Sequence, residues 1–407
     1  MRHFFFGIVL LFETVAFGQA NPVAPQCSSA IDAGGYLYLA GQTANRPDGT
    51  VAERFSEQAA QALENVKAIV NASGLTMDHI VYVQVYLENI DDYPLFESIF
   101  KKYFPIVPPA GAVLGVAKLP SPDIQINAVA VRDTNGRKAV IPPNYKWEGP
   151  FSPGILTHDR LFVSAMQGRD PQSGKLADEP GLQTDLALDG LNAVVVSAGL
   201  TMKHFVFVNP YLTSKIPSKV MNERYARRFE FGNTPARATI EVTALPLLAQ
   251  IEYTGVAVRD LSLRRAVRPK NMPPSPTASP CVFAGETLYC SAKSGFIPGP
   301  HGGVFGSSTA AQVRQTMRNQ LDNLQEADMD FNQVVSTTVY LDDISDSGTF
   351  NKVYAEYFPD APPAQTIVQQ LPSADRSPDS DGHYPDLEQM SLIAVRTPKT
   401  TVDKLCK

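Results

Sequence analysis

Two charged residues in the middle third of the chain, an Arg and a Glu, are of the kinds that bind a carboxylate-bearing molecule and act on it. Arg237 lies in the run Thr234-Pro-Ala-Arg237, and Glu252 follows in Gln250-Ile-Glu252. An Arg fork can bind a carboxylate through two parallel, charge-assisted hydrogen bonds. An acid nearby can position a water and shuttle protons. We therefore expect both side chains to converge on one anion-bearing molecule between domains; the competing interpretation is a structural cross-strand ion pair.

The elements that must position these residues occur three times along the chain. One marker recurs as ASGLTMDHIVYVQVYL at Ala72–Leu87, SAGLTMKHFVFVNPYL at Ser197–Leu212 and, more faintly, EADMDFNQVVSTTVYL at Glu326–Leu341. A second marker is VAVRD at residues 129–133 and 256–260, and IAVRT at 393–397. A period of roughly 125–135 residues is too long for a solenoid repeat, so each copy should carry its own core.

The first copy predicts an α+β unit. Val, Ile and Tyr alternate in its strand segments, and apolar residues recur at helical spacing in two others, the first ending at Gly74. The expected elements are a hairpin in 30–42, helices over 56–74 and 93–104, and strands over 80–87, 113–116 and 124–131. This order predicts a mixed sheet with two helices on one face.

The copies predict three domains in a chain of 407 residues, which is long enough for three separate cores. The expected boundaries are 21–133, 145–260 and 275–397, followed by a tail at 398–407. Linkers are expected at Thr134–Trp147 and Leu261–Ser279, and the second contains Pro-Pro-Ser-Pro.

With these residues in view, each copy resembles the RidA family, also called YjgF or L-PSP. The most specific match is the run from Thr234-Pro-Ala-Arg237 to Leu245-Pro246, followed by Glu252 on the last strand. The resemblance implies a chorismate-mutase-like fold and, because RidA-like proteins form homotrimers with sites between subunits, an intramolecular pseudo-trimer. The alternative is three independent domains joined like beads.

The resemblance also implies an activity, the hydrolysis of small reactive enamine or imine acids to 2-keto acids and ammonia. Arg237 matches the carboxylate-binding Arg, and Glu252 matches the catalytic acid that positions water. Other matched positions are expected to contact the substrate: Ser164, Asn222, Phe151 where the family often has Tyr, and Thr239 where it often has Cys.

The other two copies depart from this pattern. In copy one, Gly111 replaces the Arg, Gln125 the acid, Ala40 the Ser, and Glu97 the Asn. In copy three, Gln replaces both charged groups, at Gln365 and Gln389, whereas Ser291 and Asn351 survive. A Gln amide can hydrogen-bond neutral groups but supplies no charge. At most one interface of a ring is therefore expected to keep both charged groups.

The first twenty residues predict a secretory signal peptide. Arg2 and His3 precede an apolar run at 4–12, and small residues follow near 18–20. We therefore expect an exported protein, periplasmic or extracellular, with no membrane segment after cleavage. The net charge of −6 has no basic block, which argues against a nucleic-acid partner.

The cysteines predict one disulfide. Cys281 and Cys290 flank an expected two-residue turn at Gly285-Glu286, and pairing outward from this turn places them directly opposite each other. Such a bond suits an oxidising compartment. The sequence leaves open whether Cys27 and Cys406 pair.

Other motifs point to no cofactor and no metal. The six histidines lack metal-ligand spacing, and the chain has no phosphate-binding loop, dinucleotide fingerprint or nucleophile elbow. We expect a monomer that deaminates a small carboxylate-bearing substrate. A non-catalytic metabolite-binding or scaffold protein is the alternative, favoured by Phe151 and the lost Arg positions. An L-PSP-type endoribonuclease is the weakest of the three, since no His-based acid–base pair is evident.

Overall fold

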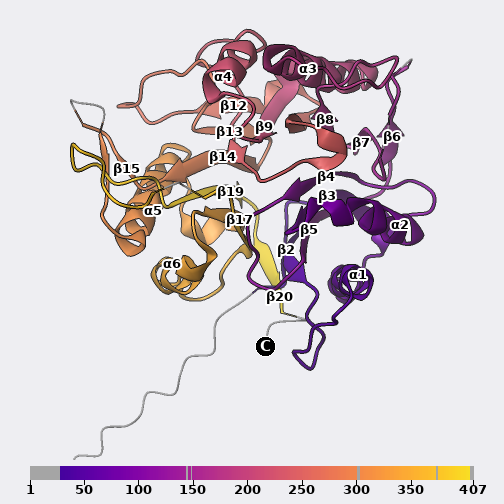
Figure 1. Cartoon of the computed structure of the whole chain (residues 1–407), viewed down its shortest axis with the longest axis horizontal. Coiled ribbons are helices and arrows are strands. Elements are labelled where there is room, and N and C mark those ends of the chain that lie inside the picture. The colour runs from indigo at the N-terminus through magenta and orange to yellow at the C-terminus, as the bar shows by residue number, and fades with distance from the viewer. Residues whose placement is uncertain (1–27, 144, 148, 300–302, 373–374, 404–407) are drawn as a thin grey trace, which may run out of the picture.

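A computed structural model of the chain describes residues 28–403 apart from 144, 148, 300–302 and 373–374. It shows three α+β units in tandem, each with two helices covering one face of a six-stranded sheet (Figure 1). The predicted fold class is confirmed. The expected signal peptide, Cys27 and Cys406 lie outside the described residues.

Unit 1 has the predicted order of elements. Its elements are β1 (Ala30–Ala33), β2 (Tyr36–Thr43), α1 (Phe55–Ala72), η1 (Met77–His79), β3 (Ile80–Leu87), η2 (Ile90–Asp92), α2 (Tyr93–Tyr103), β4 (Ala110–Gly115) and β5 (Ile124–Val131). Gly34 and Gly35 both have positive φ, as a two-residue hairpin turn requires. Gly74, also at positive φ, lies just beyond the end of α1.

Units 2 and 3 repeat this order. Unit 2 contains β7 (Gly154–Leu156), β8 (Arg160–Gln167), α3 (Pro180–Ser197), η3 (Met202–His204), β9 (Phe205–Leu212), α4 (Ser218–Ala226), β10 (Ile240–Glu241), η4 (Pro246–Leu248) and β11 (Ile251–Val258). Unit 3 contains β13 (Cys281–Ala284), β14 (Thr287–Ser294), β15 (Phe296–Ile297), β16 (Val304–Phe305), α5 (Thr309–Glu326), η6 (Phe331–Gln333), β17 (Val334–Leu341), η7 (Ile344–Asp346), α6 (Ser347–Tyr354), β18 (Ala364–Gln369) and β19 (Glu388–Val395).

Each sheet also receives an edge strand from the preceding unit. The strand orders are β20-β1-β2-β5-β3-β4, β10-β9-β11-β8-β7-β6 and β12-β13-β14-β19-β17-β18. The received strands are β6 (Lys138–Val140), β12 (Arg264–Val267, after η5, Leu261–Leu263) and β20 (Lys399–Val402). Because β20 pairs with β1, the exchange closes a cycle from unit 3 back to unit 1.

This exchange changes the interpretation of three segments expected to be linkers or a tail. Residues 134–147 contain β6, residues 261–279 contain β12, and the expected tail at 398–407 contains β20. The sequence pattern did not reveal these strands because each is short and half-exposed, and its pairing partner lies in another unit.

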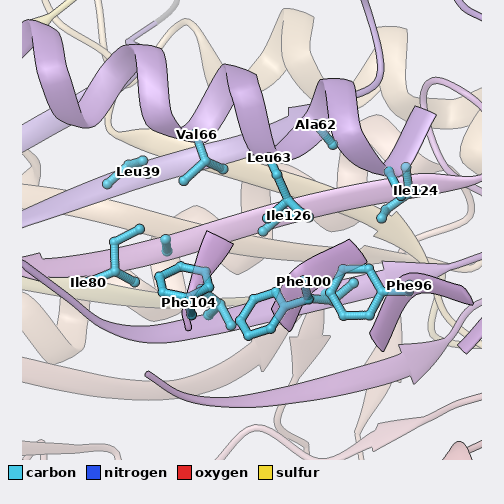
Figure 2. Close-up of a cluster of buried hydrophobic side chains, with 14 of the residues drawn as sticks. Leu39, Ala62, Leu63, Val66, Ile80, Phe96, Phe100, Phe104, Ile124 and Ile126 are labelled. Carbon is cyan, nitrogen blue, oxygen red and sulfur yellow. The ribbon is translucent and has the colours of Figure 1, made fainter. Parts of the chain in front are cut away.

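The core of each unit lies between its sheet and its helices. In unit 1, Leu63 and Val66 of α1 and Phe96 and Phe100 of α2 are at most 1% exposed and pack over Ile126 of β5 (Figure 2). Truncating one such side chain to Ala typically costs about 2–5 kcal/mol. This packed layer holds the sheet in place against the helices. The other face of the sheet lies toward the neighbouring units.

The opposite sheet faces pack against one another. One buried cluster combines Tyr36 and Tyr38 of unit 1 with Phe162 of unit 2 and Val395 of unit 3. A second cluster includes Tyr86, Tyr211 and Tyr340, one from each unit. The units therefore share apolar interiors.

The Cys281–Cys290 disulfide is present as predicted, across the β13–β14 pair with the Cα atoms 4.0 Å apart. Gly285 in its turn has positive φ. Among the described helices, none has the length and apolar character to span a bilayer.

Candidate functional sites at the interfaces between units

The candidate residues lie where neighbouring units meet. At the 1–2 interface, β4 of unit 1 lies against β8 of unit 2, and at the 3–1 interface β18 lies against β2. At the 2–3 interface, the chain around Arg237 lies against β14, because the Arg237 amide donates to Ser291 Oγ at 2.8 Å. Each interface therefore combines the Arg position of one unit with the acid position of the next.

Glu252 belongs to the 1–2 interface. It is 1% exposed and lines a cavity of about 50 Å³ together with Gly111 of unit 1 and Phe151 of its own unit. Its Oε2 accepts a hydrogen bond from Gln167 Nε2 at 3.2 Å, whereas Oε1 has no hydrogen-bond partner among the described residues. Burial raises the pKa of this carboxyl to about 8, and the Gln167 bond opposes the shift. Glu252 is therefore mostly protonated at neutral pH.

The Arg position of the 1–2 interface is filled by an aromatic ring. A Cβ atom at Gly111 would lie 2.8 Å from Phe151 Cε1 and 2.8 Å from the Val83 carbonyl oxygen. Phe151 is held there by an edge contact with Phe100, at 5.1 Å between ring centroids, and by Trp147 Nε1, which donates to its carbonyl at 2.7 Å. No side chain longer than that of glycine fits at position 111 without displacing this ring.

Arg237 belongs to the 2–3 interface. Its Nη1 donates to Asn222 Oδ1 at 2.8 Å, and the guanidinium carbon lies 5.1 Å from the centroid of the Tyr225 ring. Burial lowers the pKa of Arg237 from its usual high value, and the Tyr225 and Tyr253 side chains oppose this shift. The acid position here is Gln389, whose Nε2 donates to the Thr239 carbonyl at 3.3 Å. The structure thus joins the side chains of Arg237 and Asn222, whereas Thr239 contacts Gln389 through its backbone carbonyl.

The expected convergence of Arg237 with Glu252 is wrong. Glu252 is directly opposite Tyr211, so both face the cluster shared by the units. Arg237 follows Ala236, the partner of Phe207, and so lies beside Val208, which faces the helices of unit 2. Because side chains alternate along a strand, Arg237 and Glu252 project from opposite faces of one sheet. They serve different interfaces.

The Ser164 hydroxyl has a structural role. Its hydroxyl accepts from the Gly111 amide at 2.9 Å and donates to the Ser152 carbonyl at 2.5 Å. Ser291 repeats this arrangement at the 2–3 interface, accepting from the Arg237 amide and donating to the Ser279 carbonyl at 2.7 Å. The buried serine therefore joins the strands of neighbouring units, whichever ligand the interface holds.

The 3–1 interface has neither charged group. Gln365 and Gln125 occupy the Arg and acid positions, and Ala40 replaces the Ser. Asn127 Nδ2 donates to Thr366 Oγ1 at 2.9 Å across this interface. The 1–2 interface thus has the acid alone, the 2–3 interface has the Arg alone, and the 3–1 interface has neither.

Sequence reasoning missed most of the residues that line the 1–2 cavity, among them Tyr145, Trp147, Gln167 and Arg169. The first two lie in the segment expected to be a linker. Gln167 is the last residue of β8, the strand that carries Ser164, and Arg169 lies two residues beyond it, a position that could have drawn attention. Elsewhere, Asp379, Asp381 and His383 each bring one ligand atom within 4.8 Å of the others, but all three are exposed.

A family model described as "Endoribonuclease L-PSP" matches residues 18–132, 144–259 and 271–373. Curated relatives include a 2-iminobutanoate/2-iminopropanoate deaminase of Dermatophagoides farinae, 34% identical over 28% of this chain and 93% of that protein. Another of the same name, from Salmonella typhimurium, is 35% identical over 30% of this chain and 98% of that protein. A protein of Aquifex aeolicus, 36% identical over 27% of this chain and 91% of its own length, is named a RutC family protein.

Solved structures that resemble the chain each cover about one unit. Yeast Mmf1 is 32% identical and covers 28% of this chain and 96% of its own, with a TM-score of 0.26. YyfA of Yersinia pestis, a conserved Rid family protein, is 30% identical over 30% of this chain and 98% of its own, with a TM-score of 0.28. On the three family-model matches, the chain belongs to the RidA family, also called YjgF or L-PSP.

Proposed function

We propose that this protein is a metabolite-binding member of the RidA family that holds the carboxylate of a small 2-keto or 2-imino acid at Arg237. The observation that carries the proposal is the orientation of this guanidinium. Asn222 and the Tyr225 ring fix it, while its side-chain hydrogen bonds to the described residues come from Nη1 alone. A partly exposed fork with further donors can bind a carboxylate bidentately.

The same interface lacks the group that hydrolysis needs. Gln389 stands opposite Tyr340 as Glu252 stands opposite Tyr211, and it donates to the Thr239 carbonyl, so Gln389 is the acid-position residue of the interface that includes Arg237. A neutral amide cannot accept a proton from water at neutral pH. The acid that could do so, Glu252, is at the 1–2 interface. Binding without turnover follows from this separation.

Hydrolytic deamination of small enamine or imine acids remains the second candidate function. The observation that favours it is the name of two relatives, both 2-iminobutanoate/2-iminopropanoate deaminases at 34–35% identity over one unit. In this chain it would have to proceed with Arg237 alone or Glu252 alone. We therefore rank it below binding.

Calorimetric titration with 2-ketobutyrate tests the binding proposal. We expect the wild type to bind and Arg237→Ala to lose about tenfold or more in affinity, since a charge-assisted pair is removed. Arg265→Ala is a matched control, because Arg265 also lies over an aromatic ring, Phe283, but on the exposed surface. Equal binding by wild type and Arg237→Ala would refute the proposal.

An imine assay separates the two candidates. Imines generated in place by an amino-acid oxidase are supplied to the protein, and ammonia release is followed. We expect no release above the uncatalysed rate, with binding of the keto acid intact. Release that is lost in Arg237→Ala would establish the deaminase instead.

Export is part of the proposal. The apolar run at residues 4–12 motivates it, and the Cys281–Cys290 disulfide supports an oxidising compartment. Mass spectrometry of the mature N-terminus tests it: cleavage near residues 18–20 is expected, and an intact Met1 in the purified native protein would contradict it.

A further inference from the structure

The 1–2 cavity holds a buried acid whose second oxygen lacks a partner. Glu252 Oε2 is bonded to Gln167, but Oε1, although it is excluded from bulk water, has no hydrogen-bond partner among the described residues. Such an oxygen in a buried setting ordinarily has a partner, because leaving it unpaired is costly. Glu252 lines a cavity, so a ligand held there can supply the missing donor.

The 1–2 cavity also lacks the Arg that unit 2 has at the equivalent position and that could bind an anionic group. Glycine stands at position 111, and the Phe151 ring occupies the space beside it. Restoring a side chain there requires the ring to move. The ligand that fits this cavity is therefore one whose recognised group donates hydrogen bonds to a carboxylate.

The walls of the cavity suit a small organic cation. Four aromatic residues line it: Tyr93, Tyr145, Trp147 and Phe151. Aromatic ring faces attract alkylammonium groups, and a buried carboxylate supplies the counter-charge. A volume of about 50 Å³ limits the ligand to a few heavy atoms.

Two cationic residues also line the cavity, and both donate to carbonyl oxygens of the loops. Arg169 donates to Gln167 Oε1 at 2.9 Å, to the Gly174 carbonyl at 3.1 Å and to the Leu247 carbonyl. Lys146 Nζ donates to the Ser173 carbonyl at 3.3 Å. The Gln167 side-chain amide thus lies between the two charged groups. Its oxygen accepts from the Arg169 guanidinium, and its nitrogen donates to the Glu252 carboxyl. A carboxylate on the ligand, if there is one, would lie toward Arg169.

We propose that the 1–2 cavity binds a small ligand through its protonated amino group, with the Glu252 carboxylate as the anionic partner. The site is separate from Arg237 and does not depend on the proposed function there. The amino group can belong to a simple alkylamine or to an amino acid, and the two differ in the carboxylate that Arg169 would meet.

Binding should release a proton. The pKa of Glu252 is raised to about 8 by burial, so near pH 7 an ammonium ligand must displace the carboxyl proton. Tyr82 and Tyr211, the buried titratable groups near Glu252, have their pKa values raised, mainly by burial and further by Glu252, and stay neutral. Affinity should therefore rise about tenfold per pH unit from pH 6 toward pH 8 and then level off.

Calorimetric titration of the full chain with ethylammonium, glycine and propionate tests the proposal. We expect ethylammonium or glycine to bind, with nearly one proton released at pH 7 in a comparison of two buffers, and propionate not to bind. Stronger binding of glycine than of ethylammonium would assign the amino acid as the ligand class, and equal binding the plain amine. Propionate binding without ethylammonium or glycine binding would overturn the proposal.

Variants separate this site from the rest of the protein. Glu252→Gln resembles the protonated carboxyl in shape and should fold, as its thermal midpoint would show, but lose ammonium binding. Glu388→Gln, which changes another buried acid far from the cavity, should bind like the wild type. Arg237→Ala should also keep ammonium binding, so failure at one interface is distinguishable from failure at the other. Unchanged binding by Glu252→Gln would refute the site.

Discussion

The guanidinium of Arg160 lies over the ring of Tyr36, with its central carbon 4.4 Å from the ring centroid. The two residues occupy the same place in successive units, Tyr36 opposite Val131 and Arg160 opposite Val258, and the third unit has Thr287 there, opposite Val395. A homotrimer with Arg at this place would bring three like charges together. A single chain can carry one Arg there and surround it with two different partners.

Arg160→Met should destabilise the protein by about 3 kcal/mol, because it leaves two buried hydroxyls and the partly exposed Asp159 without their cationic partner. The lost donors reach Thr287 Oγ1 at 2.7 Å and the Tyr289 hydroxyl at 3.0 Å. Thermal unfolding followed by circular dichroism measures the effect. Arg265→Met, at an exposed Arg that also lies over a ring, should change stability by no more than about 0.5 kcal/mol. Equal midpoints for the two variants would contradict the role of Arg160.

Gln389→Glu should introduce imine hydrolysis at the 2–3 interface, because it places a carboxylate at the acid position of the interface that includes Arg237. We expect a rate about a hundredfold above that of the wild type, the usual contribution of a positioned acid–base group. The coupled oxidase assay with ammonia detection measures it. In Arg237→Ala/Gln389→Glu the gain should disappear. A folded single variant that binds 2-ketobutyrate but gains no activity would show that more than the acid is missing.

Glu388 should make the protein less stable as the pH rises. The carboxyl is fully buried, accepts a hydrogen bond from Thr316 Oγ1 at 2.5 Å, and has a pKa raised by burial from 4.5 to about 8. The unfolded chain ionises this group above about pH 4.5 and the folded protein only near pH 8, so unfolding releases a proton between these values. Stability is therefore lost through this window as the pH increases.

Glu388→Gln should flatten that dependence, because the amide cannot ionise. Thermal midpoints of both proteins at pH 5, 6, 7 and 8 check this, and the gap should widen in favour of the variant toward pH 8. Glu252 and Asp386, whose pKa values burial raises to about 8 and about 7, leave a residual slope in the variant. Parallel curves for the two proteins would rule out Glu388 as a source of the slope.

Small-angle scattering should report a compact monomer. The strand exchange through β6, β12 and β20 and the shared buried clusters favour the pseudo-trimer that the resemblance implies. A compact chain of 407 residues and 44.3 kDa should have a radius of gyration of about 22 Å. A markedly larger radius at the monomer mass would instead support separate beads.

The sequence by itself determined the three units, their elements and the disulfide. The repeated markers located the copies, and alternation within Ile80–Leu87 and helical spacing near Val66 identified a strand and a helix. Cys281 and Cys290 were paired correctly because a two-residue turn fixes the register of its flanking strands. These features depend on contacts close in sequence, which a local pattern records.

Only the tertiary structure decided which residues share a site. Arg237 and Glu252 come from one unit and match one motif, but they project from opposite faces of its sheet, Glu252 toward the cluster shared by the units and Arg237 toward α4 of its own unit. Likewise, the pairing of β20 with β1 joins the two ends of the described chain. Packing between units sets these relationships over separations of a hundred residues and more, and no local pattern records the identity of the neighbour.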